Sequence, residues 1–321
     1  MKLKNILPII GIFLLVYLIY KIGPYNLFNT LKNANLFYIG LGLITTPIFI
    51  LPLGYKWYKI LKLQNFDLKF PYIMKIYYIG AFYGFITPAR AGSLLRAYYI
   101  KEKTKKGLIE CASSIIIERI LDLFVIFLFA FIGSLIFLNK LNINMIHILI
   151  ITFLIFFSLI LIFMRKERGI FVLSIFYNYL LPKNMREKAD DSLNKFYNSL
   201  PKLRKLIYIL FLTIITWLIL YFQVYLFGLA FNIEVPFHIF LTFMSIGTVV
   251  ATIPISISGL GTRELTLITL FSLYNINPEA IVSMSLSSFF GIGTLEALIG
   301  LFFIIKEKKK NEILNYNSIS S

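Results

Sequence analysis

The sequence predicts an all-α integral membrane protein with six full transmembrane spans and two broken or re-entrant helical hairpins. Of its 321 residues, 59% are hydrophobic and only 15% are charged. A soluble domain of this length would need many more polar residues to cover its surface. The formal net charge is nonetheless +17, because Lys and Arg crowd into the short segments between long apolar runs. Apolar runs separated by basic loops are typical of a multi-pass membrane protein.

The full spans follow from the need for about 20 mostly apolar residues per crossing. The predicted spans are 5–22, 36–56, 108–138, 145–164, 206–231 and 279–305. The first span resembles a signal peptide, but no small-residue cleavage site follows it, so we expect it to remain uncleaved. Residues 1–305 are therefore expected to form a single polytopic membrane domain, followed by a basic cytoplasmic tail over 306–321.

Two further apolar segments, 71–100 and 236–274, are interrupted near their middle. The interrupting residues are Pro88 and Gly92 in the first segment and Pro254, Gly259 and Gly261 in the second. Proline removes a helical hydrogen bond and glycine weakens a helix. Each segment is therefore predicted as two half-helices that meet at a bent tip. Both a re-entrant hairpin and a pair of complete crossings satisfy this pattern.

The distribution of basic residues predicts the orientation. If each broken segment enters and leaves on the same side, nearly all loop Lys and Arg fall on one side, and only Lys21, Lys32 and Lys140 fall on the other. Basic loops face the cytoplasm, so both termini are expected on the cytoplasmic side. The protein itself is expected in the cell membrane. The two tips then approach the midplane from opposite faces, as in an inverted repeat. The connection 165–205 is expected to carry a cytoplasmic amphipathic helix.

Charged residues inside the apolar segments indicate a central polar site. Such groups cost about 2.5–3.5 kcal/mol each in a span and usually face a protein interior or a water-filled cavity. Four polar residues recur every fourth position and predict one polar helix face: Glu110, Ser114, Glu118 and Asp122. Arg119 is expected to reach Asp122. The predicted substrate-binding residues are Arg90, Arg96, Glu118, Arg119, Asp122, Arg263 and Glu264.

The tips themselves predict an anion site. Ser93 and Thr262 are expected to cap the half-helices that start there, and a helix start presents unpaired N–H groups to an anion such as phosphate. Arginine beside such a start adds bidentate recognition. The predicted hinge or tip residues are Pro88, Gly92, Ser93, Pro254, Gly259, Gly261 and Thr262. The alternative is structural: Arg–Glu pairs that brace a hairpin, with glycines that allow close packing.

Three stretches, 88–96, 118–122 and 259–264, resemble in order the signatures of the lysylphosphatidylglycerol synthase transmembrane region family, also called flippase-like or UPF0104 membrane proteins. The resemblance covers nearly the whole chain. It implies lipid transport, with a membrane phospholipid or a polyprenyl-phosphate-linked lipid as the partner. The family usually carries Glu where this chain has Ser93. The family's bifunctional members add a cytosolic aminoacyl-transfer domain. The tail after residue 305 has no room for such a domain, so we expect no synthase activity.

Other classes of function find little support in the sequence. A single cysteine, Cys111, and two distant histidines, His147 and His238, predict no disulfide, metal site or cofactor. Anionic lipid accounts for the basic charge, so no nucleic-acid partner is expected. An intramembrane lipid-headgroup or glycosyl transferase is the alternative to a transporter, but the sequence lacks the motifs of metal-dependent transferases. A non-transporting accessory subunit, a homo-oligomer and a partner enzyme stay open.

Overall fold

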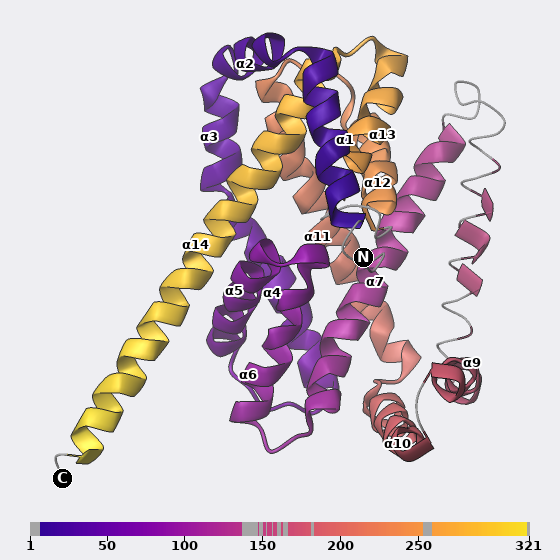
Figure 1. Cartoon of the computed structure of the whole chain (residues 1–321), viewed down its shortest axis with the longest axis vertical. Coiled ribbons are helices and arrows are strands. Elements are labelled where there is room, and N and C mark those ends of the chain that lie inside the picture. The colour runs from indigo at the N-terminus through magenta and orange to yellow at the C-terminus, as the bar shows by residue number, and fades with distance from the viewer. Residues whose placement is uncertain are drawn as a thin grey trace.

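The protein is built from helices. The computed structural model describes residues 7–136, 147, 150–151, 153–155, 157–158, 162, 166–180, 183–252 and 259–319. Over these residues every regular element is a helix and there is no strand (Figure 1). The predicted all-α class is confirmed.

The first helices follow the predicted spans closely. The structure places α1 at Leu7–Ile22, α2 at Pro24–Lys32, α3 at Leu36–Ile44 and α4 at Thr46–Leu63. Because only Thr45 separates α3 from α4, they form one apolar helix over Leu36–Leu63. The predicted span ended at residue 56, whereas the helix runs on for seven further residues to Leu63. Lys56 is buried in the protein.

The first broken segment is confirmed as two helices around a tight turn. It comprises α5 (Phe70–Ile86), the 3₁₀ helix η2 (Pro88–Leu95) and α6 (Arg96–Lys103). The 8 residues of α6 correspond to about 12 Å at 1.5 Å per residue. An apolar bilayer core is about 30 Å thick, so α6 alone is too short to cross it.

The middle of the chain holds the longest polar connection. Helix α7 spans Leu108–Ile136, and α9 (Lys166–Leu180) and α10 (Lys183–Ser199) confirm that the 165–205 connection is helical. The end of α10 is fixed to α7, because the Ser199 hydroxyl donates to Ser113 Oγ at 2.8 Å. Most of the predicted span 145–164 lies outside the described residues.

The second broken segment follows one long helix and precedes another. The helices are α11 (Leu203–Ala230), α12 (Phe237–Thr252), α13 (Thr262–Phe271), η4 (Ser272–Tyr274) and α14 (Pro278–Ile319). The break between α12 and α13 is confirmed, although Pro254 lies outside the described residues. Helix α13 has 10 residues and is about 15 Å long, so it too is shorter than a crossing.

The two broken segments lie in opposite halves of the molecule. In Figure 1, α5 and α6 occupy the lower half of the view and α12 and α13 the upper half, while α14 runs past both. Helix α14 packs closely on α5, since a Cβ at Gly300 would lie 2.2 Å from the Tyr78 carbonyl oxygen. The larger apolar core joins α7, α11, α12, α13 and α14, and a smaller one surrounds Trp57.

Among the residues that the structure describes, three helices are long and apolar enough to cross a membrane. They are Leu36–Leu63, Arg204–Ala230 and Pro278–Glu307. Helix α7 has comparable length but carries Glu118, Arg119 and Asp122 near its middle. The count of six spans and the re-entrant path of the two broken segments stay predictions.

Candidate functional site

Charged side chains gather at each break of the chain. The first polar cluster comprises Ser93 and Arg96 from the first break, Lys56 from α4, and Glu118, Arg119 and Asp122 from α7. The second polar cluster comprises Gly261, Arg263 and Glu264 at the start of α13, with Ser285 from α14.

The center of the first polar cluster is a buried ion pair between α6 and α7. Arg96 Nη2 donates to Glu118 Oε2 at 2.8 Å, and the two residues are 3% and 2% exposed. The guanidinium carbon lies 4.5 Å from the Trp57 ring centroid and 4.9 Å from that of Tyr77, within the range of cation–π attraction. Arg96 is therefore held on every side by this chain, as the structural alternative predicts.

Arg119 lies next to this pair but points outward. Its Nη2 donates to the Ser93 hydroxyl at 2.9 Å, and its side chain is exposed. On the same face of α7, Ile116 and Ile120 are 37% and 38% exposed. Among the described residues, no carboxylate lies within ion-pair distance of Arg119. Arg119 is therefore paired with no carboxylate among the described residues, and its positive charge can attract an added anion.

Asp122 pairs with a residue that the sequence analysis missed. Its Oδ1 accepts a hydrogen bond from Lys56 and another from Trp217 Nε1 at 2.9 Å. The predicted pairing of Arg119 with Asp122 is therefore wrong, because α4 brings a lysine to the carboxylate. Lys56 is only 1% exposed. The signal that could have identified it is its place in a stretch rich in aromatic and aliphatic residues that runs on to Leu63.

The predicted polar face of α7 is confirmed for Ser114, Glu118 and Asp122. Ser114 Oγ accepts from Trp57 Nε1 at 3.1 Å, Glu118 binds Arg96, and Asp122 binds Lys56. All three polar side chains thus face α4 and α6. The helical spacing predicted the face correctly, and tertiary packing selected the partners.

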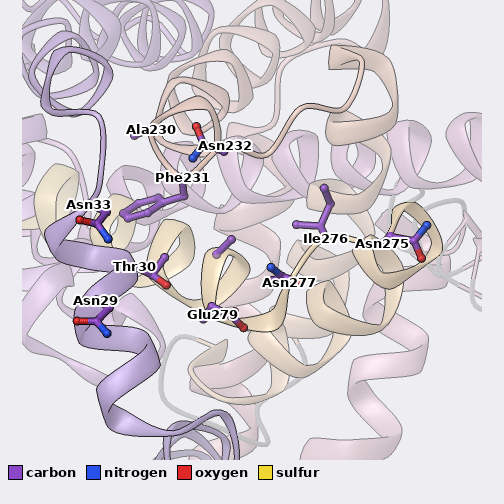
Figure 2. Close-up of a pocket in the computed structure, with 11 residues that line it drawn as sticks. Asn29, Thr30, Asn33, Ala230, Phe231, Asn232, Asn275, Ile276, Asn277 and Glu279 are labelled. Carbon is purple, nitrogen blue, oxygen red and sulfur yellow. The ribbon is translucent and has the colours of Figure 1, made fainter.

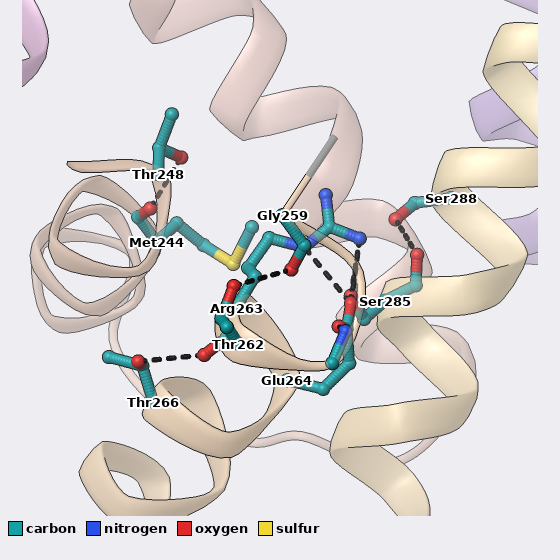
Figure 3. Close-up of polar contacts among 10 residues, drawn as sticks. Met244, Thr248, Gly259, Thr262, Arg263, Glu264, Thr266, Ser285 and Ser288 are labelled. Atoms are coloured by element: carbon teal, nitrogen blue, oxygen red, sulfur yellow. Dashed lines mark hydrogen bonds and ion pairs between the residues drawn. The ribbon is translucent and has the colours of Figure 1, made fainter. Parts of the chain in front are cut away.

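The second polar cluster is built around Glu264, which is fully buried. Its Oε2 accepts from the Gly261 backbone N–H at 2.6 Å. Its Oε1 accepts from Arg263 Nη2 at 2.8 Å and from Ser285 Oγ at 2.6 Å (Figure 3). Glu264 therefore satisfies an unpaired N–H group at the start of α13. The Arg263 side chain is 15% exposed.

Both predicted helix caps are displaced. Gly261, with φ of 85°, precedes α13 as its N-cap, and Thr262 is the first helical residue. A positive φ suits glycine, which lacks the Cβ that makes this conformation costly. At the first break, η2 extends to Leu95, so Ser93 lies inside the 3₁₀ turn and caps no α-helix.

Gly92 at the first tip is required by close packing. A Cβ there would lie 2.3 Å from the Tyr83 carbonyl oxygen, and the Gly92 N–H donates to Thr87 Oγ1 at 2.7 Å. The glycine thus lets η2 fold back against the end of α5. The side chains of Pro88 and Arg90 lie outside the described residues.

The two polar clusters are each closed by local contacts. Within the described part of the chain, no hydrogen bond or ion pair joins a member of one cluster to a member of the other. A series of side-chain contacts nevertheless leads from the first polar cluster to α12. Trp217, which binds Asp122, packs on Tyr221 with ring centroids 5.3 Å apart, and the Tyr221 hydroxyl donates to Thr248 at 3.2 Å. The single central polar site that the sequence predicts therefore stays a prediction.

Comparison with known proteins identifies the family. The model of the lysylphosphatidylglycerol synthase TM region matches residues 6–300. The chain belongs to this family. A UPF0104 membrane protein of Methanocaldococcus jannaschii is 26% identical over 307 residues, which cover 89% of this chain and 90% of the relative. Membership agrees with the long apolar helices and identifies a membrane protein of the flippase-like family.

The family resemblance led us to expect an acid where this chain has Ser93. In the structure the Ser93 hydroxyl is the described partner of Arg119. This partner is neutral, so it does not compensate the positive charge of the arginine.

Proposed function

We propose that this protein is a flippase-like transporter that moves a lipid with an anionic or sugar-phosphate headgroup between the two leaflets. The observation that carries the proposal is Arg119. This exposed residue lies on an apolar face of α7, beside the first break, and its described partner is the neutral Ser93 hydroxyl. Membership of a membrane family with flippase-like members supports the same conclusion.

The physical argument begins with the cost of a charge in an apolar layer. An arginine within a span is disfavoured by about 2.5–3.5 kcal/mol unless it finds water or an anion. A lipid phosphate can accept two parallel hydrogen bonds from one guanidinium. A lipid that reaches Arg119 along the exposed isoleucines would keep its acyl chains in the bilayer while its phosphate contacts the charge.

The other predicted site residues take different parts in this proposal. Arg263, which is 15% exposed, and Arg90, at the first tip, supply further positive charge to the headgroup. Arg96 and Glu118 position the tip by holding α6 against α7. Asp122 and Glu264 balance nearby cations.

Movement of the headgroup would depend on the two breaks. Because α6 and α13 are short and lie in opposite halves of the molecule, each tip is placed to open toward one side (Figure 1). We propose alternate exposure of the site through small rotations at the tips, with Gly259 and Gly261 as pivots. Both glycines have positive φ and precede the first turn of α13.

A reconstituted transport assay tests the proposal. Purified protein in liposomes should move fluorescent phosphatidylglycerol between leaflets, as followed by chemical quenching of the outer leaflet. Arg119→Ala should slow the movement about tenfold or more, because a charge-assisted hydrogen bond contributes about 1.5–3 kcal/mol. Arg119→Lys should retain part of the activity.

The matched control is Lys62→Ala, which removes a positive charge from an exposed pair with Asp67. This variant should transport as fast as the wild type. Transport by Arg119→Ala at the wild-type rate would show that the site is wrongly assigned. No transport by the wild type, with any anionic lipid, would overturn the function itself.

A further inference from the structure

A polar pocket of about 360 Å³ lies away from both polar clusters, where three turns of the chain meet (Figure 2). One wall comes from α2, a second from the α11–α12 turn, and a third from the start of α14. The volume falls within the range of small-molecule sites. Five of its lining residues are asparagines: Asn29, Asn33, Asn232, Asn275 and Asn277.

The walls of the pocket are fixed by contacts within the protein. The Asn35 N–H donates to the Ala230 carbonyl oxygen at 2.9 Å and so joins the first turn to the second. Phe231 and Ala280, which line the pocket, are buried in the larger apolar core. The pocket is therefore preformed, which reduces the entropy that a ligand loses on binding.

Backbone conformation explains two of the asparagines but not the other three. Asn232 and Asn275 have φ of 57° and 55°, a region where asparagine is enriched among residues with a side chain. Asn29, Asn33 and Asn277 have negative φ. Among the described contacts, the side-chain amides of these three make no hydrogen bond to the protein. Their donors and acceptors are available to a ligand.

The charge of the pocket selects the class of ligand. An amide offers two N–H donors and a carbonyl acceptor, which together match a hydroxyl group that both donates and accepts. Glu279 adds an acceptor and a negative charge, and no Lys or Arg is among the lining residues that the structure describes. Phosphate would meet a carboxylate without a compensating cation. Neutral hydroxyl groups fit this surface best.

We propose that this pocket binds the hydroxyl groups of a neutral sugar or polyol. The inference deepens the proposed function and rests on it, since a sugar carried by the transported headgroup would supply this chemistry. The charge-based topology places all three turns on the external face, where a headgroup would arrive or leave. A soluble saccharide is the other source of the same chemistry.

Binding of methyl β-glucoside to the full-length protein in lipid nanodiscs tests the pocket directly. Saturation-transfer NMR should show saturable binding that inorganic phosphate does not displace. The double variant Asn29→Ala/Asn277→Ala should weaken binding about tenfold or more, through the loss of two polar partners. Asn277→Asp, which has the same shape but lacks the amide donors, should weaken it less.

The matched control is Asn65→Ala, which removes an exposed turn asparagine outside the pocket. It should bind like the wild type, and unchanged unfolding temperatures should show that the pocket variants remain folded. Absence of saturable binding to the wild type, or equal binding by the double variant, would overturn the proposal.

A transport arm separates the two sources of sugar. If the ligand is a headgroup, the double variant should slow a fluorescent glucosyl-diacylglycerol while phosphatidylglycerol moves as in the wild type. If the ligand is a soluble saccharide, methyl β-glucoside binding should fall while both lipids move normally. Sugar binding by a protein that moves no lipid would support the pocket and overturn the transport function, so the two failures are distinguishable.

Discussion

The two breaks in this chain hold their charges in different ways. At the first, Arg96 binds Glu118, which lies 22 residues away on another helix. At the second, Arg263 binds the adjacent residue Glu264, whose other oxygen accepts the Gly261 N–H. The first break is therefore fastened by a tertiary contact, and the second by the start of its own helix, with Ser285 as a link to α14. Loss of an acid should thus have a global effect at the first break and a more local one at the second.

The largest loss of stability is expected for Glu118→Ala. The variant leaves the Arg96 guanidinium buried and unpaired, which costs about 3–5 kcal/mol. Thermal unfolding in detergent should show the loss. Replacing both partners with Leu should recover much of it, because a buried apolar pair leaves no charge unpaired. A loss below about 1 kcal/mol for the single variant would contradict the tertiary role of this pair.

The Lys56–Asp122 pair tests whether burial decides the size of the effect. Asp122→Ala leaves Lys56, which is 1% exposed, without its partner and should cost about 3 kcal/mol. Lys56→Met should cost less, about 1–2 kcal/mol, because the Asp122 side chain is 17% exposed and keeps the Trp217 hydrogen bond. Thermal unfolding of the two variants measures which one loses more stability. A larger loss for Lys56→Met than for Asp122→Ala would contradict the idea that burial decides the size of the effect.

Glu264→Ala should have a smaller effect on overall stability, about 2 kcal/mol, since Arg263 is partly exposed and can reach water. Hydrogen exchange with mass spectrometry should show faster exchange in α13 with little change in α7. Glu264→Gln keeps an acceptor for the Gly261 N–H and should lose less protection. Equal loss of protection across the whole molecule would remove the distinction between the two breaks.

The sequence predicted the features that depend on local chemistry. The positions of proline and glycine predicted both breaks, and the recurrence of polar residues at every fourth position predicted the polar face of α7. Partners were predicted less well, since an i+3 spacing allowed Arg119 to reach Asp122 while packing brought Lys56 there instead. The predicted span ended at Lys56 because a buried, paired lysine and a loop lysine look alike in a charge count. Both caps were displaced because 3₁₀ and left-handed residues occupy the tips.

The smallest effect on stability is expected for Arg119→Ala. The side chain is exposed and its described contact is one hydrogen bond to Ser93, so the change should stay within about 0.5 kcal/mol. Thermal unfolding beside Glu118→Ala gives the comparison directly. A loss as large as that of Glu118→Ala would mean that Arg119 braces the fold and is not available to a lipid.

The account depends most on Arg119 as the contact for an anionic headgroup. Native mass spectrometry of the protein released from detergent with added phosphatidylglycerol measures this contact without requiring transport. The account predicts bound phosphatidylglycerol on the wild type and on the Lys62→Ala control, and a clear loss of bound lipid on a normally folded Arg119→Ala variant. Equal lipid retention by all three proteins would contradict it.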